Sequence, residues 1–431
     1  MKSVAFQTLG CKINQTETAA LQTLFEQSGY TAVPFNAHAD VYIINTCTVT
    51  HIGDRKSRQA IRRARRSNPE AVIVVTGCYA QVAPEEVLAL PEVDLVVGTH
   101  AREKLPQLVK EAKKGRLNCV APLEDKGCFE SLPPAQSIER TRAFLKIQEG
   151  CRQFCSYCIV PYARGPLYSR SVGAVVKEVQ RLAGNGFREL VLTGVHLGSY
   201  GVDLPERPDL SELISAIVPV AGIERIRLSS IEPTEITSAL VDVIIENSKV
   251  CRHLHIPLQS GDDYILKRMN RKYDAGEFLH LAQWLQAKVP GIALTTDVMV
   301  GFPGESEAHF ARTVEVVKRC CFSRLHVFKY SPRRGTPAAK FQGQVPSGIK
   351  EERSRLLIET GSQLAALFRS RFIGETVQVL FEEKTGRGRL AGLTEHYIRV
   401  IAKAPTALSG SLADVRISGE EQDSLYGELL K

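Results

Sequence analysis

Short apolar runs separated by segments of helical period make up the N-terminal part of the chain. The runs are apolar and predict β-strands at residues 4–9, 41–46, 71–77 and 94–98. Between the first two runs, residues 14–29 place Leu21 and Phe25 on one face of a helix. Asn14 is the expected N-cap and Gly29 the expected end. This alternation predicts a parallel sheet covered on both faces.

A second series of strand-like runs follows a proline-containing linker at residues 121–141. The runs lie at residues 143–149, 189–197, 225–231, 253–261, 293–302 and 324–331. Helical stretches separate them, so the pattern predicts six βα units in a partial barrel, fewer than the eight of a closed (β/α) barrel. The active sites of such sheets lie in the loops that follow the strands.

From about residue 368 the helical pattern gives way to short alternating runs split by Gly and polar turns. Regularly spaced short strands of this kind predict a small antiparallel β-barrel. The whole chain is therefore expected to be an α/β protein of three domains. They are an N-terminal domain at residues 1–120, a partial barrel at residues 140–366 and a C-terminal β-barrel at residues 368–431.

The composition indicates the compartment, the cysteine chemistry and the kind of partner to expect. The 431 residues are 44% hydrophobic, which suits ordinary cores, and no window approaches the roughly 20 apolar residues of a membrane span. We expect a cytoplasmic protein without a membrane partner. Eleven cysteines in a reducing compartment favour metal or redox chemistry over disulfides. A net charge of +8 favours an acidic partner but does not by itself establish nucleic-acid binding.

Three cysteines follow three of the N-terminal strands. Cys11, Cys47 and Cys78 each stand near the carboxyl end of a predicted strand, and these ends meet at one edge of a parallel sheet. A single buried cysteine usually packs as a small hydrophobe, but three at equivalent positions favour a metal site. The other five have no ligand-like spacing and are interpreted as packing residues or incidental surface thiols: Cys119, Cys128, Cys251, Cys320 and Cys321.

A second set of three cysteines lies in the loop after the first barrel strand. The segment EGCRQFCSYC holds Cys151, Cys155 and Cys158 in a CxxxCxxC spacing. Three thiolates can bind three corners of a 4Fe–4S cubane and leave the fourth iron open for a reacting group. Zinc is the alternative, but no histidine lies nearby in the sequence to complete a closed site.

The CxxxCxxC spacing at the start of a partial barrel resembles the radical S-adenosylmethionine enzymes. The resemblance implies that the open iron binds S-adenosylmethionine and that Tyr157, just before the last cysteine, packs near its adenine. It also implies cofactor contacts further along, although each of those segments equally suits an ordinary strand and turn. The residues concerned are Gly194, Ser230, Gln259 and Asp297.

The upstream triad narrows the resemblance to the methylthiotransferases, which carry a second 4Fe–4S cluster in an N-terminal domain. TLGCKINQTE and EGCRQFCSYCIVPYARG are most similar to the branch that modifies threonylcarbamoyladenosine beside the tRNA anticodon. The branches that modify isopentenyladenosine in tRNA or an aspartate of a ribosomal protein remain alternatives. A non-catalytic iron–sulfur RNA-binding sensor is the alternative from another class.

This family implies a reaction with two clusters in two roles. An electron from a donor such as flavodoxin or ferredoxin reaches the CxxxCxxC cluster, and S-adenosylmethionine is cleaved to methionine and a 5′-deoxyadenosyl radical. The radical removes hydrogen from position two of the adenine ring, and the second cluster presents methylated sulfur to that carbon. No catalytic residue is implied beyond the cluster ligands.

Basic residues suit an RNA substrate such as a tRNA anticodon stem-loop. Residues 55–66 contain seven Lys or Arg and no acid, and Arg58, Arg62 and Arg66 share one helix face. That face either contacts phosphates or is a solvated basic face. Arg164, beside the CxxxCxxC loop, is expected either to orient RNA or a cofactor carboxylate or to brace the loop.

The C-terminal segment resembles the TRAM domain, a nucleic-acid-binding module of RNA-modifying enzymes. Arg387, Arg389 and Arg399 are its candidate phosphate contacts and equally suit solvent-facing positions on a barrel.

Overall fold

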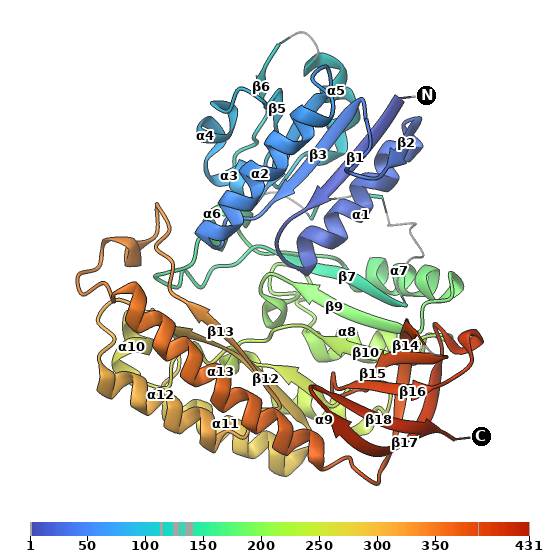
Figure 1. The fold of residues 1–431 in the computed structure, drawn as a ribbon, viewed down its shortest axis with the longest axis vertical. Coiled ribbons are helices and arrows are strands. Elements are labelled where there is room, and N and C mark those ends of the chain that lie inside the picture. Colours follow the sequence, from blue (N-terminus) through green and yellow to red (C-terminus); the bar gives the residue numbers. More distant parts are fainter. Residues whose placement is uncertain are drawn as a thin grey trace. The chain divides into compact units, whose positions relative to one another are not determined.

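The computed structural model describes residues 2–112, 115–123, 129–130, 132–133, 141–386 and 388–430 (Figure 1). The predicted linker at 121–141 falls largely outside these residues, as do Cys128 and Arg387. The chain forms two compact units. The first unit consists of residues 1–137, 148–170 and 331–339, and the second of residues 138–147, 171–330 and 340–431. No helix among the described residues is long and apolar enough to cross a membrane.

The first unit is built on a parallel sheet of strand order β2-β1-β3-β4-β5-β6. Its strands are β1 (Lys2–Thr8), β2 (Tyr30–Val33), β3 (Val41–Thr46), β4 (Val72–Gly77), β5 (Leu95–Val96) and β6 (Leu117–Asn118). The four predicted strands are β1, β3, β4 and β5, so the predicted parallel sheet is confirmed. Strands β2 and β6, of four and two residues, were not predicted.

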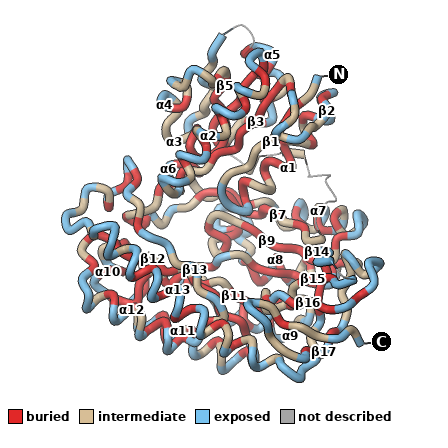
Figure 2. The backbone as a smooth tube through the Cα atoms, in the orientation of Figure 1, coloured by how far each residue is buried: buried red, intermediate tan, exposed pale blue. Residues whose placement is uncertain are grey.

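Helices cover both faces of this sheet. They are α1 (Lys12–Gln27), α2 (His51–Ser67), α3 (Cys78–Val82), α4 (Pro84–Leu88) and α5 (Leu105–Ala112), with a 3₁₀ turn at Arg102–Lys104. Ile43 of β3 packs with Leu21 of α1 on one face, whereas Ile44 packs with Ile61 of α2 on the other. Strands β3 and β4 are buried along their whole length (Figure 2), as expected for strands covered on both sides.

The start of α1 differs from the prediction. Cys11 is the N-cap residue, and no side chain caps the helix. Asn14 lies one turn inside, where its amide donates to the carbonyl oxygens of Leu9 at 2.8 Å and Thr46 at 3.0 Å. The side-chain oxygen that could cap the helix instead accepts from Arg164 at 2.6 Å, while the amide N–H groups pair loop carbonyls that would be costly to leave unpaired.

The second unit contains the predicted six strands of a partial barrel. They are β7 (Arg142–Glu149), β9 (Glu189–Gly194), β10 (Arg225–Leu228), β11 (His253–His255), β12 (Ala293–Val300) and β13 (Arg324–Lys329). β7 begins in this unit and ends in the first, where it pairs with β8 (Tyr168–Ser169). The strand orders are β10-β9-β7-β8 and β11-β12-β13, and isolated bridges such as Ser230 to His255 connect the two sheets.

Helices between these strands bury their apolar faces in one large core. They are α7 (Val172–Gly184), α8 (Leu210–Ile217), α9 (Ser238–Glu246), α10 (Asp263–Arg268), α11 (Ala275–Lys288) and α12 (Glu307–Arg319). The long helix α13 (Ser347–Ser370) follows β13 and packs against it. The predicted α/β fold with a partial barrel is therefore confirmed.

The C-terminal strands close into a small barrel of order β14-β15-β16-β18-β17. They are β14 (Thr376–Gly386), β15 (Arg389–Leu393), β16 (Arg399–Lys403), β17 (Leu412–Glu421) and β18 (Ser424–Leu429). All pairs are antiparallel except β16 with β18, which is parallel and closes the barrel. Alternate residues such as Val379, Phe381 and Val400 fill the interior, so the predicted C-terminal barrel is confirmed.

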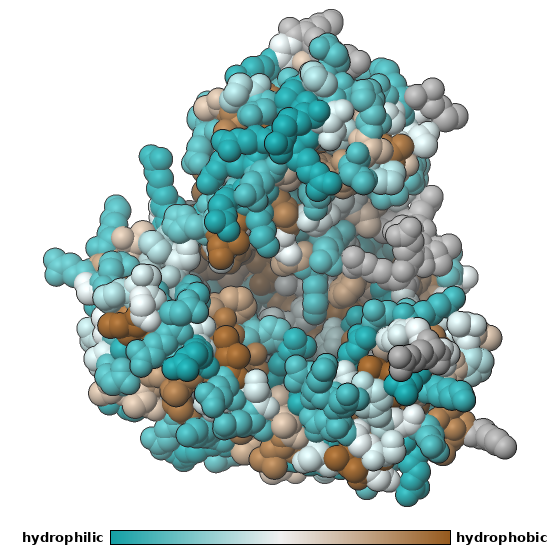
Figure 3. Space-filling model, viewed as in Figure 1, coloured by the Kyte–Doolittle hydropathy of each residue, from teal (hydrophilic) through white to brown (hydrophobic). Residues whose placement is uncertain are grey.

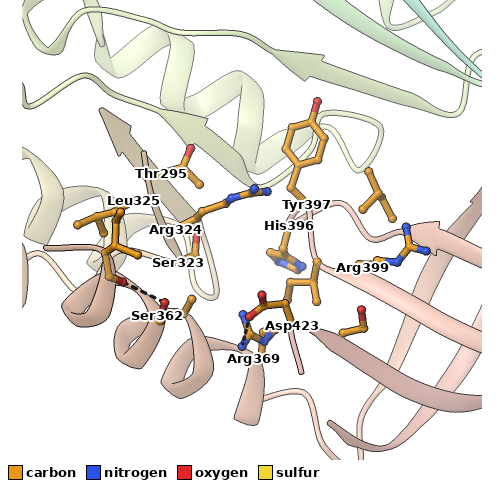
Figure 4. A pocket seen from close by; sticks show the side chains of 16 residues that line it. Thr295, Ser323, Arg324, Leu325, Ser362, Arg369, His396, Tyr397, Arg399 and Asp423 are labelled. Carbon is orange, nitrogen blue, oxygen red and sulfur yellow. Dashed lines mark hydrogen bonds and ion pairs between the residues drawn. The ribbon is translucent and has the colours of Figure 1, made fainter. Parts of the chain in front are cut away.

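A cavity of about 410 Å³ lies between β12, β13, α13 and this barrel (Figure 4). Arg369 of α13 pairs across it with Glu420 at 2.7 Å and Asp423 at 3.5 Å. Burial lowers the pKa of His396 to about 4, so its imidazole is neutral at pH 7. Of the residues predicted to bind a metal, a cofactor or RNA, the cavity lining includes Arg399, a candidate phosphate contact of the C-terminal barrel.

The buried side chain of Arg227 on β10 ties the partial barrel to the C-terminal barrel. It donates to Glu189 at 2.9 Å and to the carbonyl oxygen of Thr394 at 3.1 Å, and it lies 3.9 Å from the ring centroid of Tyr397. Arg227→Ala should lower the free energy of unfolding by about 3–5 kcal/mol, because the buried Glu189 then keeps only Arg225, 3.7 Å away, as a balancing charge. Urea denaturation followed by circular dichroism measures this change.

Arg188→Ala is the matched control. Arg188 is 43% exposed and lies 3.5 Å from Glu224, so its loss should cost less than about 1 kcal/mol. Equal destabilisation by the two variants would contradict the role given to Arg227.

Candidate metal centres

Cys11, Cys47 and Cys78 lie together at the carboxyl edge of the first unit's sheet. They follow β1, β3 and β4, which are neighbours in the sheet. Cys11 directly precedes α1, Cys47 lies in the loop between β3 and α2, and Cys78 begins α3. The thiols are close enough to influence one another's ionisation. The convergence expected from the parallel strands is present in the structure.

Gly10 makes this convergence possible. Its φ is +109°, a conformation that residues with a side chain rarely adopt, and a Cβ atom there would lie 2.7 Å from Cβ of Cys47. The glycine therefore lets the chain turn out of β1 in direct contact with the second cysteine of the triad.

Burial controls the ionisation of these thiols. It raises the pKa of Cys78 to about 12, against the opposing effect of the nearby Arg164 guanidinium. It also raises the pKa of Cys47. Such thiols stay protonated at neutral pH unless a strong positive charge binds them, and a coordinated metal deprotonates a thiol outright.

Cys151, Cys155 and Cys158 lie in the tight segment between β7 and α6 (Val160–Arg164). The amide of Cys151 donates to the carbonyl of Gly165 at 3.0 Å, and that of Cys158 donates to the carbonyl of Cys155 at 2.9 Å. The amide of Gln153 donates to the Cys151 sulfur at 3.5 Å. These bonds fold the three cysteines into one compact segment.

Gly150 starts this segment with φ +76°. A Cβ atom at this position would lie 1.6 Å from the carbonyl oxygen of Pro166. The backbone of residues 150–151 therefore runs in direct contact with the backbone of residues 165–166, and only glycine fits there.

Arg164 connects the two triads inside the first unit. It ends α6, its side chain is 2% exposed, and its Nε donates to the Cys78 sulfur at 3.3 Å. Burial alone would lower the pKa of Arg164, but Cys78, Glu17 and Glu149 raise it well above its ordinary value. This burial does not fit the RNA contact expected of Arg164 and agrees with the alternative of loop bracing.

The donor sets fit the groups that the sequence implies. Each site offers three thiols, and thiolates are the usual ligands of 4Fe–4S clusters. Among the described residues, no group of three or more His, Cys, Asp or Glu is arranged to hold a single metal ion. A cubane spaces its ligands around four irons rather than around one ion.

The remaining cysteines among the described residues are free. Cys251 and Cys320 are buried, and burial raises the pKa of each to about 12. Cys119 is half-buried and Cys321 is exposed.

The predicted cofactor residues lie in or just after strands. Tyr157 is in the cysteine segment of the first unit, half-buried between Cys155 and Cys158. The other four belong to the second unit. Gly194 ends β9, Ser230 follows β10, Gln259 follows β11 and Asp297 lies in β12.

The structure brings some of the second unit's predicted residues together. The amide of Gln259 donates to the carbonyl of Asp297 at 2.8 Å, and Gln259 has φ +62°. His255 bridges to Ser230 through the backbone and lies 3.3 Å from the Asp297 carboxylate. Both His255 and His253 contact the Thr295 hydroxyl, at 2.9 and 3.2 Å.

Sequence reasoning missed several buried polar residues beside the cysteines. Glu17 stands three residues after Asn14, the spacing of a capping box, but in the structure it pairs with Arg164 and Arg102. Arg333, a loop residue of the first unit, donates to Asp54 and to the Thr48 hydroxyl at 2.6 Å each. The sequence contains one indication that Asp54 is special: it is the sole acid in the first turn of the otherwise basic helix α2.

Two family models match the chain. Residues 3–98 match the model described as uncharacterized protein family UPF0004, and residues 145–317 match the radical SAM superfamily. The chain is 45% identical to the threonylcarbamoyladenosine tRNA methylthiotransferase MtaB of Bacillus subtilis, over 97% of this chain and 94% of that protein. The chain belongs to the radical SAM methylthiotransferases. The family recognised from the two cysteine triads is thereby confirmed.

Other methylthiotransferases give the same assignment at lower identity. The chain is 41% identical to MtaB of Aquifex aeolicus, over 92% of this chain and 96% of that protein. It is 36% identical to the tRNA-2-methylthio-N(6)-dimethylallyladenosine synthase of Moorella thermoacetica, over 100% of this chain and 98% of that protein.

Among solved structures, the radical S-adenosylmethionine methyltransferase TsrM of Kitasatospora setae aligns with TM-score 0.59 and 16% identity. That alignment covers 78% of this chain and 77% of TsrM, and it supports the fold.

Radical SAM enzymes use a 4Fe–4S cluster and S-adenosylmethionine, and methylthiotransferases use two clusters. The cofactors predicted from the sequence are therefore confirmed at the level of the family.

Proposed function

We propose that this methylthiotransferase inserts a methylthio group at position two of threonylcarbamoyladenosine beside the tRNA anticodon. The observation that carries the proposal is the order of identities. The relatives named as threonylcarbamoyladenosine enzymes are 45%, 41% and 37% identical to this chain, whereas those named as dimethylallyladenosine enzymes are 34–36% identical.

The two triads divide the work. Cys151, Cys155 and Cys158 hold the cluster that binds S-adenosylmethionine, and Cys11, Cys47 and Cys78 hold the cluster that presents sulfur. Reductive cleavage of S-adenosylmethionine at the CxxxCxxC cluster supplies a radical that can take hydrogen from an aromatic carbon. No side-chain acid or base does this. The chain's own residues bind the clusters and keep the two cysteine segments in contact through Arg164.

The second unit supplies the remaining cofactor contacts in this proposal. Gly194, Ser230, Gln259 and Asp297 stand in or after the strands, where partial-barrel enzymes bind their ligands. Tyr157 packs near the adenine. The electron comes from a donor such as flavodoxin or ferredoxin, and the protein works in the cytoplasm.

Three segments carry these tasks. Residues 1–120 form the methylthiotransferase domain, residues 140–366 the radical SAM barrel and residues 368–431 a TRAM-like RNA-binding barrel. Arg389 and Arg399 begin the neighbouring strands β15 and β16. Both side chains are exposed, and Arg399 lies 2.9 Å from Glu383.

Helix α2 is the main candidate surface for phosphates. Figure 3 shows hydrophilic side chains gathered over it, and Arg62 and Arg66 are exposed. Arg58 is half-buried, donates to the Tyr79 hydroxyl at 3.1 Å and lies 3.7 Å from Glu86. Arg62 is 3.9 Å from Glu92, a distance at which an exposed pair contributes little. Arg62 and Arg66 are therefore more available to an anion than Arg58.

Replacing both Arg62 and Arg66 with glutamine should weaken tRNA binding and make it less dependent on salt. Each lost phosphate contact lowers the slope of log affinity against log salt by about 1. Filter binding of the anticodon stem-loop over a salt series measures the slope. Arg319→Gln, on the exposed face of α12, is the control and should leave the slope unchanged. An unchanged slope in the double variant would remove α2 from the RNA surface.

Nucleoside mass spectrometry of tRNA from cells with and without the gene tests the substrate. The proposal predicts loss of 2-methylthio-threonylcarbamoyladenosine and accumulation of its precursor without the methylthio group. Loss of the methylthio group from isopentenyladenosine instead would assign the chain to the other tRNA branch. An unchanged tRNA profile would overturn the proposed substrate and direct the search to a ribosomal-protein aspartate.

A further inference from the structure

One buried arginine contacts side chains that come from both cysteine segments and from α1. Arg164 lies six residues after Cys158, and its Nε donates to the Cys78 sulfur at 3.3 Å. Its terminal nitrogens donate to the Asn14 amide oxygen at 2.6 Å and to both Glu17 carboxylate oxygens. A contact at 3.3 Å to Glu149, at the end of β7, completes the set.

The guanidinium of Arg164 belongs to a buried network of arginines and carboxylates. Glu17 also accepts from Arg102 at 2.9 Å, and Arg102 in turn pairs with Glu130. The side chains of Arg164, Arg102, Glu17, Glu149 and Glu130 are all at most 5% exposed. Two cations therefore face three carboxylates within a buried network. Removing Arg164 would take one buried cation away from the carboxylates of Glu17 and Glu149 beside Cys78.

Arg164 lies where its charge acts on any thiolate-bound group at Cys11, Cys47 and Cys78. Thiolates and the cluster they hold are anionic, and a buried negative charge needs a nearby cation or hydrogen-bond donor. Arg164 supplies both at Cys78. Its fork of donors also fixes the orientation of the guanidinium, because its terminal nitrogens are held by Asn14, Glu17 and Glu149.

We propose that Arg164 is a positioning residue of the Cys11–Cys47–Cys78 cluster. It holds Cys78 in place, supplies the positive charge that favours the reduced cluster, and fixes the sulfur-presenting site to the segment that carries the other cluster. This inference rests on the two-cluster function proposed above. It gives a buried arginine that is not a cluster ligand a role in holding and tuning the cluster.

Loss of the Arg164 charge is expected to lower the reduction potential of the N-terminal cluster. Reduction adds one electron to an already anionic cluster, and a cation beside a ligand sulfur stabilises that product. Arg164→Gln should therefore disfavour reduction of the N-terminal cluster at least tenfold. For a one-electron couple a tenfold change corresponds to about 59 mV.

The test observes the N-terminal cluster alone. Full-length protein carrying Cys155→Ala, which lacks a ligand of the other cluster, is reconstituted anaerobically and titrated with reductant while the reduced cluster is followed by electron paramagnetic resonance. Iron is counted per chain. Arg164→Gln is compared with Arg102→Gln, which loses the same partner Glu17 from an equally buried site but has no hydrogen bond to a cysteine. Arg164→Lys retains the charge without the planar fork.

Support for Arg164 is a potential at least about 59 mV lower in Arg164→Gln, a smaller shift in Arg164→Lys and no shift in Arg102→Gln. Loss of the N-terminal iron in Arg164→Gln alone, with its circular dichroism unchanged, also supports the role. Equal potentials in all variants, or equal iron loss in Arg164→Gln and Arg102→Gln, would overturn it. If the Cys155→Ala parent itself bound no cluster, the two-cluster function would fail, and this outcome is distinguishable from failure of the Arg164 role.

Discussion

Cys155→Ala is expected to abolish both the cleavage of S-adenosylmethionine and the modification of tRNA. Cys155 is the central cysteine of the CxxxCxxC segment, and it is buried within the folded loop. Without its thiolate the cluster loses one of three ligands, and the site that binds S-adenosylmethionine is lost with it. Chromatographic measurement of 5′-deoxyadenosine from anaerobically reconstituted protein with dithionite should show a fall to background.

Cys11→Ala is the matched comparison. Cys11 lies at the start of α1 in the other triad, so this variant should still form 5′-deoxyadenosine while methylthio insertion into tRNA falls to background. Iron per chain should fall by about half in each variant, because each loses one of two equal clusters. Equal loss of cofactor cleavage in both variants would contradict the division of labour between the two triads.

Gly150→Ala is expected to have nearly as large an effect without removing any ligand. A Cβ atom would lie 1.6 Å from the Pro166 carbonyl oxygen, and φ of +76° adds about 1–2 kcal/mol of strain for alanine. The backbone must then move away from residues 165–166, which breaks the hydrogen bond from Cys151 to Gly165. Iron bound at the CxxxCxxC site and formation of 5′-deoxyadenosine should both fall to background.

Gly173→Ala separates this effect from a general sensitivity of glycines. Gly173 lies in α7, and a Cβ atom there would meet nothing within 4 Å. This control should retain full iron content and be slightly more stable, by about 0.5–1 kcal/mol. Full iron in Gly150→Ala would show that the close approach at residue 166 does not shape the cluster segment.

The strands and the convergence of the first triad could be predicted because both follow from local pattern and general topology. Cys11, Cys47 and Cys78 each follow an apolar, strand-like run, and adjacent parallel strands end at the same edge of a sheet. The CxxxCxxC segment was predicted to be one site for a simpler reason, since its three cysteines are only a few residues apart. Both predictions needed no knowledge of distant contacts.

The environment of the cysteines could not be predicted in the same way. Asn14 and Glu17 suit a capping box from their spacing, yet in the folded chain they are partners of Arg164, about 150 residues away along the sequence. Sequence reasoning left Arg164 open between an RNA contact and loop bracing, because an arginine in a loop gives no sign of its burial. Such pairings join side chains of α6 and α1 that are far apart in the sequence, and no local pattern reports them.

The most direct test of the central claim is a single-turnover reaction of the reconstituted protein with a tRNA anticodon stem-loop that carries threonylcarbamoyladenosine. Mass spectrometry should detect the 2-methylthio product together with 5′-deoxyadenosine, and an otherwise identical stem-loop with unmodified adenosine should yield no methylthio product. Cleavage of S-adenosylmethionine without any methylthio product on the modified stem-loop would contradict the proposed function.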